Sequence, residues 1–179
     1  MKILSADTSI QGSLVIQLDK HRDHRGAFQA LWEREQFEAL NVDFSPDNVY
    51  HSFNTKRDTL RGLHFQSEPY QQAKLVTCIS GRVMDVAVDL CKTSPTYLQV
   101  SMVELVAGEC IAHWVPNTCA HGFWTLEASS TVSYVIEGAY RPEYAHSLRW
   151  NDPDLQIAWP HEHPILSEKD ANAPLLREL

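Results

Sequence analysis

The residues best suited to chemistry in this sequence are its nine histidines, which are not spread evenly. His51, His64, His113 and His121 fall in the central part of the chain, where the residue pattern indicates strands. Histidine gains or loses a proton near neutral pH, so each of these four is a candidate acid, base or metal ligand. A single buried histidine is, however, more often a hydrogen-bonded core residue than a catalyst. The polar residues around the histidines therefore decide between the two interpretations.

Several other polar residues occur in the same strand-like segments. Residues 60–66 alternate, so that His64 shares a face of a predicted strand with Gly62. Lys74 follows after a turn-prone stretch, and Tyr134 lies in the middle of a later apolar run. Each has a structural explanation, as an edge-strand charge or a core aromatic. As a set they require a polar cavity, and in a small β-barrel such a cavity is a ligand site.

The elements that must position these side chains are predicted to be strands. Residues 82–90 alternate with period two, which indicates a strand with two distinct faces. Further runs rich in β-branched and aromatic residues, separated by turn residues, occupy 74–80, 97–105, 110–115, 122–126 and 131–136. Short strands at about 8–12-residue spacing are typical of a β-sandwich or barrel.

Helix signals occur only near the two ends of the chain. Residues 32–40 are good helix formers with spaced apolar residues, and Ser167–Asp170 resembles a capping box. At roughly 100–200 residues per domain, the 179 residues predict one domain over 1–179. The expected fold class is therefore all-β, with short flanking helices.

Composition narrows the class of partner and the location. The 15 Lys and Arg residues against 23 Asp and Glu residues give a net charge of −8, which argues against nucleic acid as a partner. The N-terminus lacks the apolar run of a signal peptide, and no stretch approaches the roughly 18 apolar residues of a membrane span. The four cysteines form no Cys-x-x-Cys pair. We therefore expect a cytoplasmic protein that contacts neither nucleic acid nor membrane.

A metal site is the first alternative for the histidines. Residues 116–121 match the jelly-roll (cupin) pattern Pro-x-Gly-x-x-His, with Thr118 in the glycine position. A metal-binding cupin also uses a His-x-His pair on an earlier strand, but the corresponding stretch here reads His64-Phe65-Gln66. Two histidines do not complete a two-His-plus-carboxylate site. The sequence therefore predicts no metal.

Six motifs, in order and at matching spacing, resemble the dTDP-4-dehydrorhamnose 3,5-epimerase family. The resemblance extends from about Asp23 to Asp170, nearly the whole chain. The motifs are Arg61–Gln66, Lys74–Val76, Asp85–Leu90, Ser94–Tyr97, Ala120–Phe123 and Trp150–Pro153. A lone Arg-Gly-Leu-His would be a weak signal, whereas six motifs in register are a specific one.

The resemblance implies a cupin-type jelly-roll fold, a homodimer, and an active site inside the barrel that needs no cofactor. The family inverts carbons beside the ketone of a nucleotide-diphosphate 4-keto-6-deoxyhexose. Removal of the C3 or C5 proton leaves an enolate on the C4 oxygen. The reaction therefore needs a base on one face of the sugar, an acid on the other, and a cation near the ketone oxygen.

The resemblance also assigns roles to residues. His64 matches the general base, with Asp170 orienting its imidazole; Tyr134 matches the proton donor, and Lys74 is placed to stabilise the enolate oxygen. The residues assigned to substrate binding are Arg25, Arg61, His121, Tyr140, Lys169 and His51. The role of Asp85 stays open.

The chain departs from the family pattern mainly at the nucleotide end. His21 and Ala27 stand where the family usually has aromatic residues, Ala30 stands where it has a glutamate, and residues 49–53 replace a Gln-x-Asn-x-Ser strand. These changes favour the hypothesis that the nucleotide is not the usual thymidine diphosphate.

Two alternative functions stay open. One is a sugar-nucleotide 3,4-ketoisomerase, which would share the proton abstraction. The other is a non-catalytic or metal-binding cupin, with a metal held by His51, His64 and His121. The position of the carbonyl in the product distinguishes the first alternative from an epimerase, and a metal assay distinguishes the second.

Overall fold

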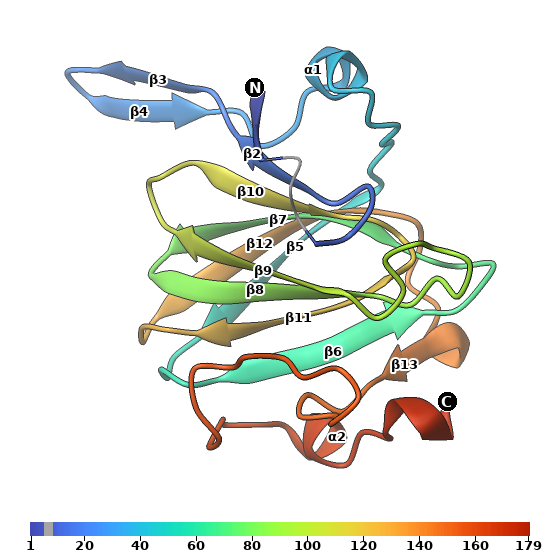
Figure 1. The fold of residues 1–179 in the computed structure, drawn as a ribbon. Coiled ribbons are helices and arrows are strands. Elements are labelled where there is room, and N and C mark those ends of the chain that lie inside the picture. The colour runs from blue at the N-terminus through green and yellow to red at the C-terminus, as the bar shows by residue number, and fades with distance from the viewer. Residues whose placement is uncertain (6–8) are drawn as a thin grey trace.

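The computed structural model describes residues 1–5 and 9–179, most of which form two antiparallel sheets that face each other (Figure 1). The six-stranded sheet has the order β1-β2-β10-β7-β12-β5, and the five-stranded sheet has the order β13-β6-β11-β8-β9. Strands β3 and β4 form a separate two-stranded hairpin. The fold is the all-β, cupin-type jelly roll that the sequence predicts, with short helices outside the sheets.

The strands are β1 (Lys2–Ser5), β2 (Leu14–Gln17), β3 (Lys20–Asp23), β4 (Gly26–Gln29), β5 (Asn48–Asn54), β6 (Leu60–Gln66), β7 (Ala73–Ser80), β8 (Arg82–Asp89), β9 (Val100–Val106), β10 (Ile111–Val115), β11 (Cys119–Thr125), β12 (Ser130–Glu137) and β13 (Ala145–Ser147). The helices are α1 (Arg34–Ala39), α2 (Glu168–Ala171) and the 3-10 turns η1 (Pro142–Tyr144) and η2 (Leu176–Glu178).

Three apolar layers hold these elements together. The central layer lies between the two sheets and includes Val76, Phe123 and Val132. A second packs α1 against the outer face of the six-stranded sheet through residues such as Phe37. A third packs the C-terminal segment against the outer face of the five-stranded sheet through residues such as Leu148. Strand β11 is buried along its whole length because both of its faces are covered.

The predicted strands over the central part of the chain are confirmed as β7 to β12. The predicted helix over 32–40 is confirmed in its central turns, as α1. The capping signal at Ser167 is also confirmed, since the Ser167 hydroxyl accepts a hydrogen bond from the backbone N–H of Asp170. The sequence pattern did not predict the short strands β1 to β4, which lack a sustained alternation.

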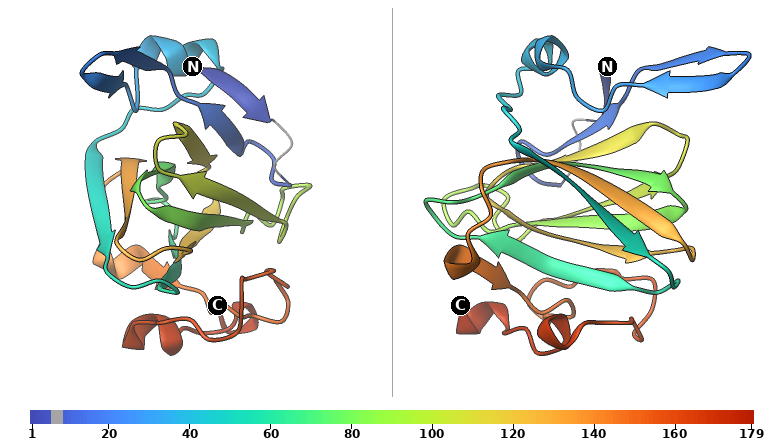
Figure 2. Two further views of the ribbon diagram at one scale, coloured as in Figure 1. Left: turned by 90° about the vertical axis from the view of Figure 1, so that its left-hand side faces the viewer. Right: turned by 180° about the vertical axis from the view of Figure 1, so that it is seen from behind.

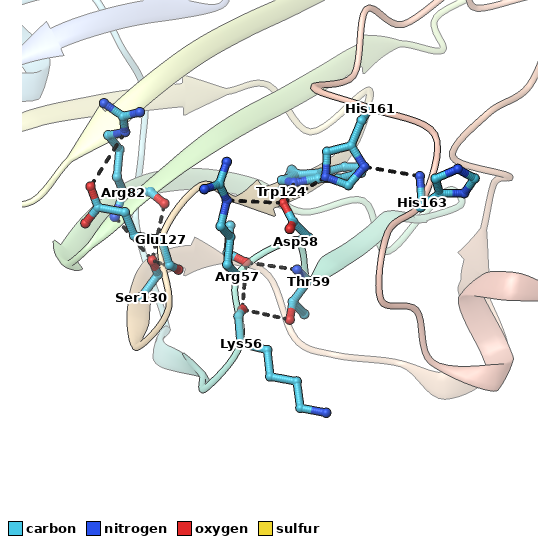
Figure 3. Close-up of polar contacts among 11 residues, drawn as sticks. Lys56, Arg57, Asp58, Thr59, Arg82, Trp124, Glu127, Ser130, His161 and His163 are labelled. Atoms are coloured by element: carbon cyan, nitrogen blue, oxygen red, sulfur yellow. Dashed lines mark hydrogen bonds and ion pairs between the residues drawn. The ribbon is translucent and has the colours of Figure 1, made fainter.

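The C-terminal segment is held against the five-stranded sheet by contacts with the turn that precedes β6 (Figure 3). The Asp58 carboxylate accepts hydrogen bonds from Trp124 Nε1 at 3.2 Å and pairs with His161 Nε2 at 3.0 Å. The backbone of Ile165 bonds to Asp58 on one side and to Leu60 on the other. This attachment matters for the site because the same segment continues into α2.

The β3–β4 hairpin extends away from the two sheets, on the side opposite to the C-terminal segment (Figure 2). Its tip carries Arg25, which pairs with Asp23 at 2.6 Å, and its strand β4 carries Phe28, whose exposed fraction is 74 %. Within the described residues, no helix has the length and apolar character that a membrane span requires.

Candidate active site

A cavity of about 420 Å³ opens between the two sheets and is lined by side chains from both. This volume lies within the range of small-molecule sites. Six of the residues predicted from the sequence line it together: Arg61, His64, Lys74, His121, Tyr134 and Tyr140. Arg61, His64 and His121 come from the five-stranded sheet, whereas Lys74 and Tyr134 come from the six-stranded sheet. A ligand in the cavity would therefore be contacted from two opposite walls.

A bulge in β6 brings Arg61 and His64 to the same cavity. His64 lies opposite His121 and Arg61 lies opposite Phe123, so β6 has one residue more than β11 over this stretch. Such a bulge re-aims side chains that strict alternation would place on opposite faces. Gly62 lies inside the bulge with φ 125°, and a Cβ there would lie 2.7 Å from the Gly122 Cα. The alternation predicted from the sequence is therefore wrong at this point, and the bulge is the reason.

The imidazole of His64 is held by Asp170, which the C-terminal segment supplies. His64 Nε2 lies 2.7 Å from Asp170 Oδ1, and the Asp170 side chain is buried while the imidazole is partly exposed to the cavity. Burial alone would raise the pKa of Asp170, but the hydrogen bond and charge of His64, together with hydrogen bonds from Ser167 and Gly62, outweigh it and the pKa is lowered. An ionised carboxylate can only accept, so Nε2 carries the proton and donates it to Asp170. In the neutral form of the imidazole, Nδ1 is then the nitrogen with a free lone pair, which is the form a base requires.

Tyr134 lies on the opposite wall from His64. It faces inward on β12 with Val132, and its ring packs edge-to-face on the His121 ring at 5.9 Å between centroids. Burial raises the pKa of the Tyr134 hydroxyl well above its usual range, and the negative charge of Asp85 raises it further. The phenol therefore keeps its proton at neutral pH and can act as a proton donor.

Lys74 is the buried cation of the cavity. Its side chain is at the inward-facing start of β7, and within the described part of the chain it forms no ion pair. Burial lowers the pKa of Lys74 to about 8, and the charge of Asp85 opposes this shift. An ammonium group without a fixed partner in a partly desolvated cavity is well suited to stabilise a negative charge that develops on a ligand.

Beneath the cavity, Asp85 joins two histidines. Its Oδ1 lies 2.8 Å from His121 Nε2 and its Oδ2 lies 2.8 Å from His113 Nδ1. Burial would raise the pKa of Asp85, but its contacts with His121 and His113 lower it to about 2. Burial lowers the pKa of His121, against the opposing charge of Asp85. His121 is therefore neutral, donates its Nε2 proton to Asp85, and presents Nδ1 as a hydrogen-bond acceptor.

The charged side chains that line the cavity are cationic. Arg61 donates its Nε proton to Asn54 Oδ1 at 2.8 Å, which fixes the guanidinium at the edge of the cavity near Tyr134. The carboxylates of Asp85 and Asp170 stand behind histidines and are not among the lining side chains. The local charge thus favours an anionic ligand although the whole chain is acidic.

Three of the predicted substrate-binding residues lie outside the cavity of this chain. Arg25 is at the tip of the β3–β4 hairpin, and Lys169 is exposed on α2. His51 faces away from the cavity on β5, between the inward-facing Tyr50 and Ser52. The geometry therefore does not place His51 together with His64 and His121 around a common metal position. Within the described residues, no three His, Cys, Asp or Glu side chains are grouped to hold a metal ion.

Sequence reasoning did not assign a function to Asp85 or His113. Both are polar residues on the inward face of an otherwise apolar strand: Asp85 lies between Val83 and Ala87, and His113 lies between Ile111 and Val115. A charge or imidazole with apolar neighbours two residues away on each side is the signal that could have marked them. Their contact with each other could not be predicted, because β8 and β10 belong to different sheets.

Comparison with known proteins identifies the chain's relatives. The family model described as dTDP-4-dehydrorhamnose 3,5-epimerase matches residues 7–178. The dTDP-4-dehydrorhamnose 3,5-epimerase of Salmonella typhimurium is 42 % identical over 173 residues, which cover 94 % of this chain and 93 % of the relative.

Solved structures agree in fold over nearly the whole chain. The crystal structure of dTDP-4-dehydrorhamnose 3,5-epimerase from Bacillus anthracis, with TDP and pyrophosphate bound, has a TM-score of 0.93 at 35 % identity and covers 98 % of this chain and 99 % of that one. The 3'-monoepimerase ChmJ from Streptomyces bikiniensis, in complex with dTDP-quinovose, has a TM-score of 0.87 at 34 % identity and covers 99 % of this chain and 88 % of that one.

Proposed function

Because the chain belongs to the dTDP-4-dehydrorhamnose 3,5-epimerase family, we propose that it inverts C3, C5 or both in a nucleotide-linked 4-keto-6-deoxyhexose. The observation that carries this proposal is the facing arrangement of an oriented base and a protonated phenol in one cavity. His64, oriented by Asp170 at 2.7 Å, lies on one wall, and Tyr134 lies on the other. Inversion of a carbon needs a proton removed from one face and returned to the opposite face.

The proposed steps follow from these positions. His64 Nδ1 takes the proton from the carbon beside the ketone, and the C–H electron pair moves to form the enolate. The Lys74 ammonium stabilises the negative charge on the C4 oxygen. Tyr134 then donates its proton to the opposite face of the carbon, and the carbonyl re-forms. His121 Nδ1 accepts a hydrogen bond from a sugar hydroxyl, and Arg61 lies where it can contact the same substrate.

The test of this proposal is product identification. The protein is incubated with dTDP-4-keto-6-deoxyglucose, and the product is reduced with borohydride and analysed by NMR. We expect inverted configuration at C3, C5 or both, with the carbonyl still at C4. A product whose carbonyl has moved to C3 would identify a ketoisomerase instead, and an unchanged sugar would reject both activities on a dTDP-linked substrate.

We infer that the nucleotide is recognised partly by residues outside this cavity. The family departures at His21 and Ala27 lie on the β3–β4 hairpin, together with Arg25. The hypothesis that these changes alter nucleotide preference is tested by thermal shift with dTDP, GDP, CDP and UDP. A selective ligand raises the unfolding midpoint. A shift with dTDP at least as large as with the other three diphosphates would reject the altered preference.

We further propose that the chain forms a homodimer through β5 and that residues 1–179 make one domain. Strand β5 is an edge strand of the six-stranded sheet, and its outward face carries His51 between Val49 and Phe53, whose exposed fractions are 60 % and 71 %. Apolar side chains of this size on a free edge favour pairing with another chain. A second copy against this edge would enclose His51. The cytoplasmic location and the absence of nucleic-acid and membrane partners stay predictions.

A further inference from the structure

His113 lies one layer below the cavity and does not line it. It is fully buried on β10, on the face that packs between the two sheets. Its Nδ1 lies 2.8 Å from Asp85 Oδ2, and its Nε2 lies 3.0 Å from Ser13 Oγ and 3.3 Å from Ser101 Oγ. A buried imidazole costs free energy unless its nitrogens are hydrogen-bonded. Here contacts at both nitrogens hold the ring in one orientation.

The second partner of Asp85 is what connects His113 to the cavity. Each Asp85 oxygen faces one imidazole N–H, so the carboxylate cannot rotate without losing a hydrogen bond. A carboxylate held in this way keeps the proton of His121 on Nε2 and its Nδ1 free for the ligand. It also keeps a fixed negative charge near Lys74. The tautomer of His121 and the charge that surrounds Lys74 therefore depend on His113, although His113 does not line the cavity.

We propose that His113 is a positioning residue of the epimerase reaction, which acts by fixing the Asp85 carboxylate that orients His121 and faces Lys74. The inference rests on the proposed function but concerns a different residue from the proton-transferring pair. His113 touches neither the cavity nor a ligand within it, so its effect passes entirely through Asp85. It should therefore alter the catalytic step more than substrate binding.

Two amide substitutions separate this role from simple core packing. In His113→Asn the amide nitrogen takes the place of Nδ1 and can still donate to Asp85. In His113→Gln the amide nitrogen takes the place of Nε2, reaches toward the serines and leaves Asp85 Oδ2 without its donor. Both variants keep a polar side chain of similar size, so a merely structural role predicts similar behaviour for the two.

The test compares the steady-state kinetics of these variants with those of wild type. We expect His113→Gln to lower kcat on the order of 10-fold with little change in KM, and His113→Asn to keep kcat near wild type. The matched control is Thr77→Val, which removes the Thr77 hydrogen bond to the Ile111 carbonyl and so loses a contact between β7 and β10, the strand that carries His113. It should lower the unfolding midpoint while leaving kcat unchanged. Equal kcat in His113→Gln and wild type would overturn the proposal.

A second measurement does not depend on turnover, and its wild-type arm needs no variant to fold. Long-range 1H–15N NMR spectra of wild type report which nitrogen of His121 carries the proton. We expect Nε2 to be protonated and Nδ1 bare at neutral pH, and a mixture of tautomers in His113→Gln. A His121 protonated on Nδ1 in wild type would overturn the proposal. If wild type shows the expected tautomer but no epimerase activity, the proposed function fails instead.

Discussion

In the proposed reaction His64 can serve as the base because Asp170 occupies its other ring nitrogen. The two residues are 106 positions apart in sequence, and their contact measures 2.7 Å. The Asp170 hydrogen bond places a proton on Nε2 and leaves Nδ1 as the nitrogen that can accept one. The sequence could identify both residues through family motifs. It could not derive their contact from alternation, because the C-terminal segment that carries Asp170 has no periodic pattern.

Tyr134→Phe should separate removal of the proton from its return on the opposite face. The variant keeps the ring that packs on His121 but has no hydroxyl proton to donate. We expect exchange of the substrate C–H with solvent to continue within a few-fold of wild type, while inverted product falls by about 100-fold. Deuterium uptake and product configuration are both measured by NMR. The control Tyr97→Phe, outside the cavity, should leave both unchanged; full inversion by Tyr134→Phe would show that another group is the acid.

The buried charge of Lys74 should lower the free energy of unfolding, although the proposed reaction needs that charge. Its pKa is 10.5 in the unfolded chain and about 8 in the fold. Below pH 8 the buried charge therefore costs stability, up to about 3 kcal/mol. Between pH 8 and 10.5 the unfolded chain binds more protons than the folded one, so this contribution to stability rises with pH.

We therefore expect Lys74→Met to raise the unfolding midpoint at pH 7 on the order of 5 °C and to abolish epimerase activity. The gain in midpoint should shrink as the pH rises from 8 toward 10.5, which thermal denaturation at several pH values measures. In wild type, kcat should fall above about pH 8 as Lys74 loses its proton. The control Lys56→Met replaces an exposed lysine and should leave the midpoint unchanged. An unfolding midpoint for Lys74→Met below that of wild type at pH 7 would contradict the claim that the buried charge of Lys74 destabilises the fold.

At the scale of elements, the β6 bulge decides which side chains meet. Alternation predicts β7 to β12 well because each of these strands has a buried inward face that enforces period two. It fails at Gly62, where one additional residue turns both Arg61 and His64 toward the cavity. A single-residue irregularity carries no periodic signal. For this reason the sequence could identify the residues of β6 but not their common direction.

Gly62→Ala should therefore damage both stability and activity. The added methyl would lie 2.7 Å from the Gly122 Cα and 2.9 Å from the His121 carbonyl oxygen. Both are backbone atoms of β11, which cannot move away without distorting that strand. We expect a loss of about 3 kcal/mol in the free energy of unfolding and a large loss of kcat, measured by urea denaturation and steady-state kinetics.

The matched control for this change is Gly108→Ala. Gly108 also has a positive φ, 86°, but no atom lies within 4 Å of an added Cβ. It should lose only about 1 kcal/mol, the cost of the backbone conformation. Equal losses at the two positions would mean that the contact between β6 and β11 at Gly62 is not what the site requires.

At the scale of the whole molecule, charge is divided between the surface and the cavity. The chain has a net charge of −8, yet the charged side chains that line the cavity, Arg61 and Lys74, are both cationic. Overall composition excludes classes of partner but does not show where charges collect, and that information comes only from the fold. The sequence also predicted Arg25 and Lys169 for the same pocket, and the fold of a single chain leaves both outside it.

The homodimer is tested by disrupting the exposed edge strand. Phe53→Arg places a charge on the outward face of β5, where an apolar side chain with an exposed fraction of 71 % now stands. We expect wild type to show twice the chain mass of 20.4 kDa in light scattering, and the variant to show the mass of one chain. Leu179→Arg, at an exposed apolar residue far along the chain, should leave the mass unchanged. A wild-type protein that is monomeric at micromolar concentration would reject the dimer.

The most direct test of proton transfer by His64 is deuterium uptake from solvent. Wild type and His64→Asn are incubated in D2O with dTDP-4-keto-6-deoxyglucose, and deuterium at C3 and C5 is followed by NMR. The His64–Asp170 arrangement predicts uptake at one or both carbons with wild type, and a rate at least about 100-fold lower with a folded His64→Asn variant. Uptake by His64→Asn at the wild-type rate would contradict the assignment of His64 as the base.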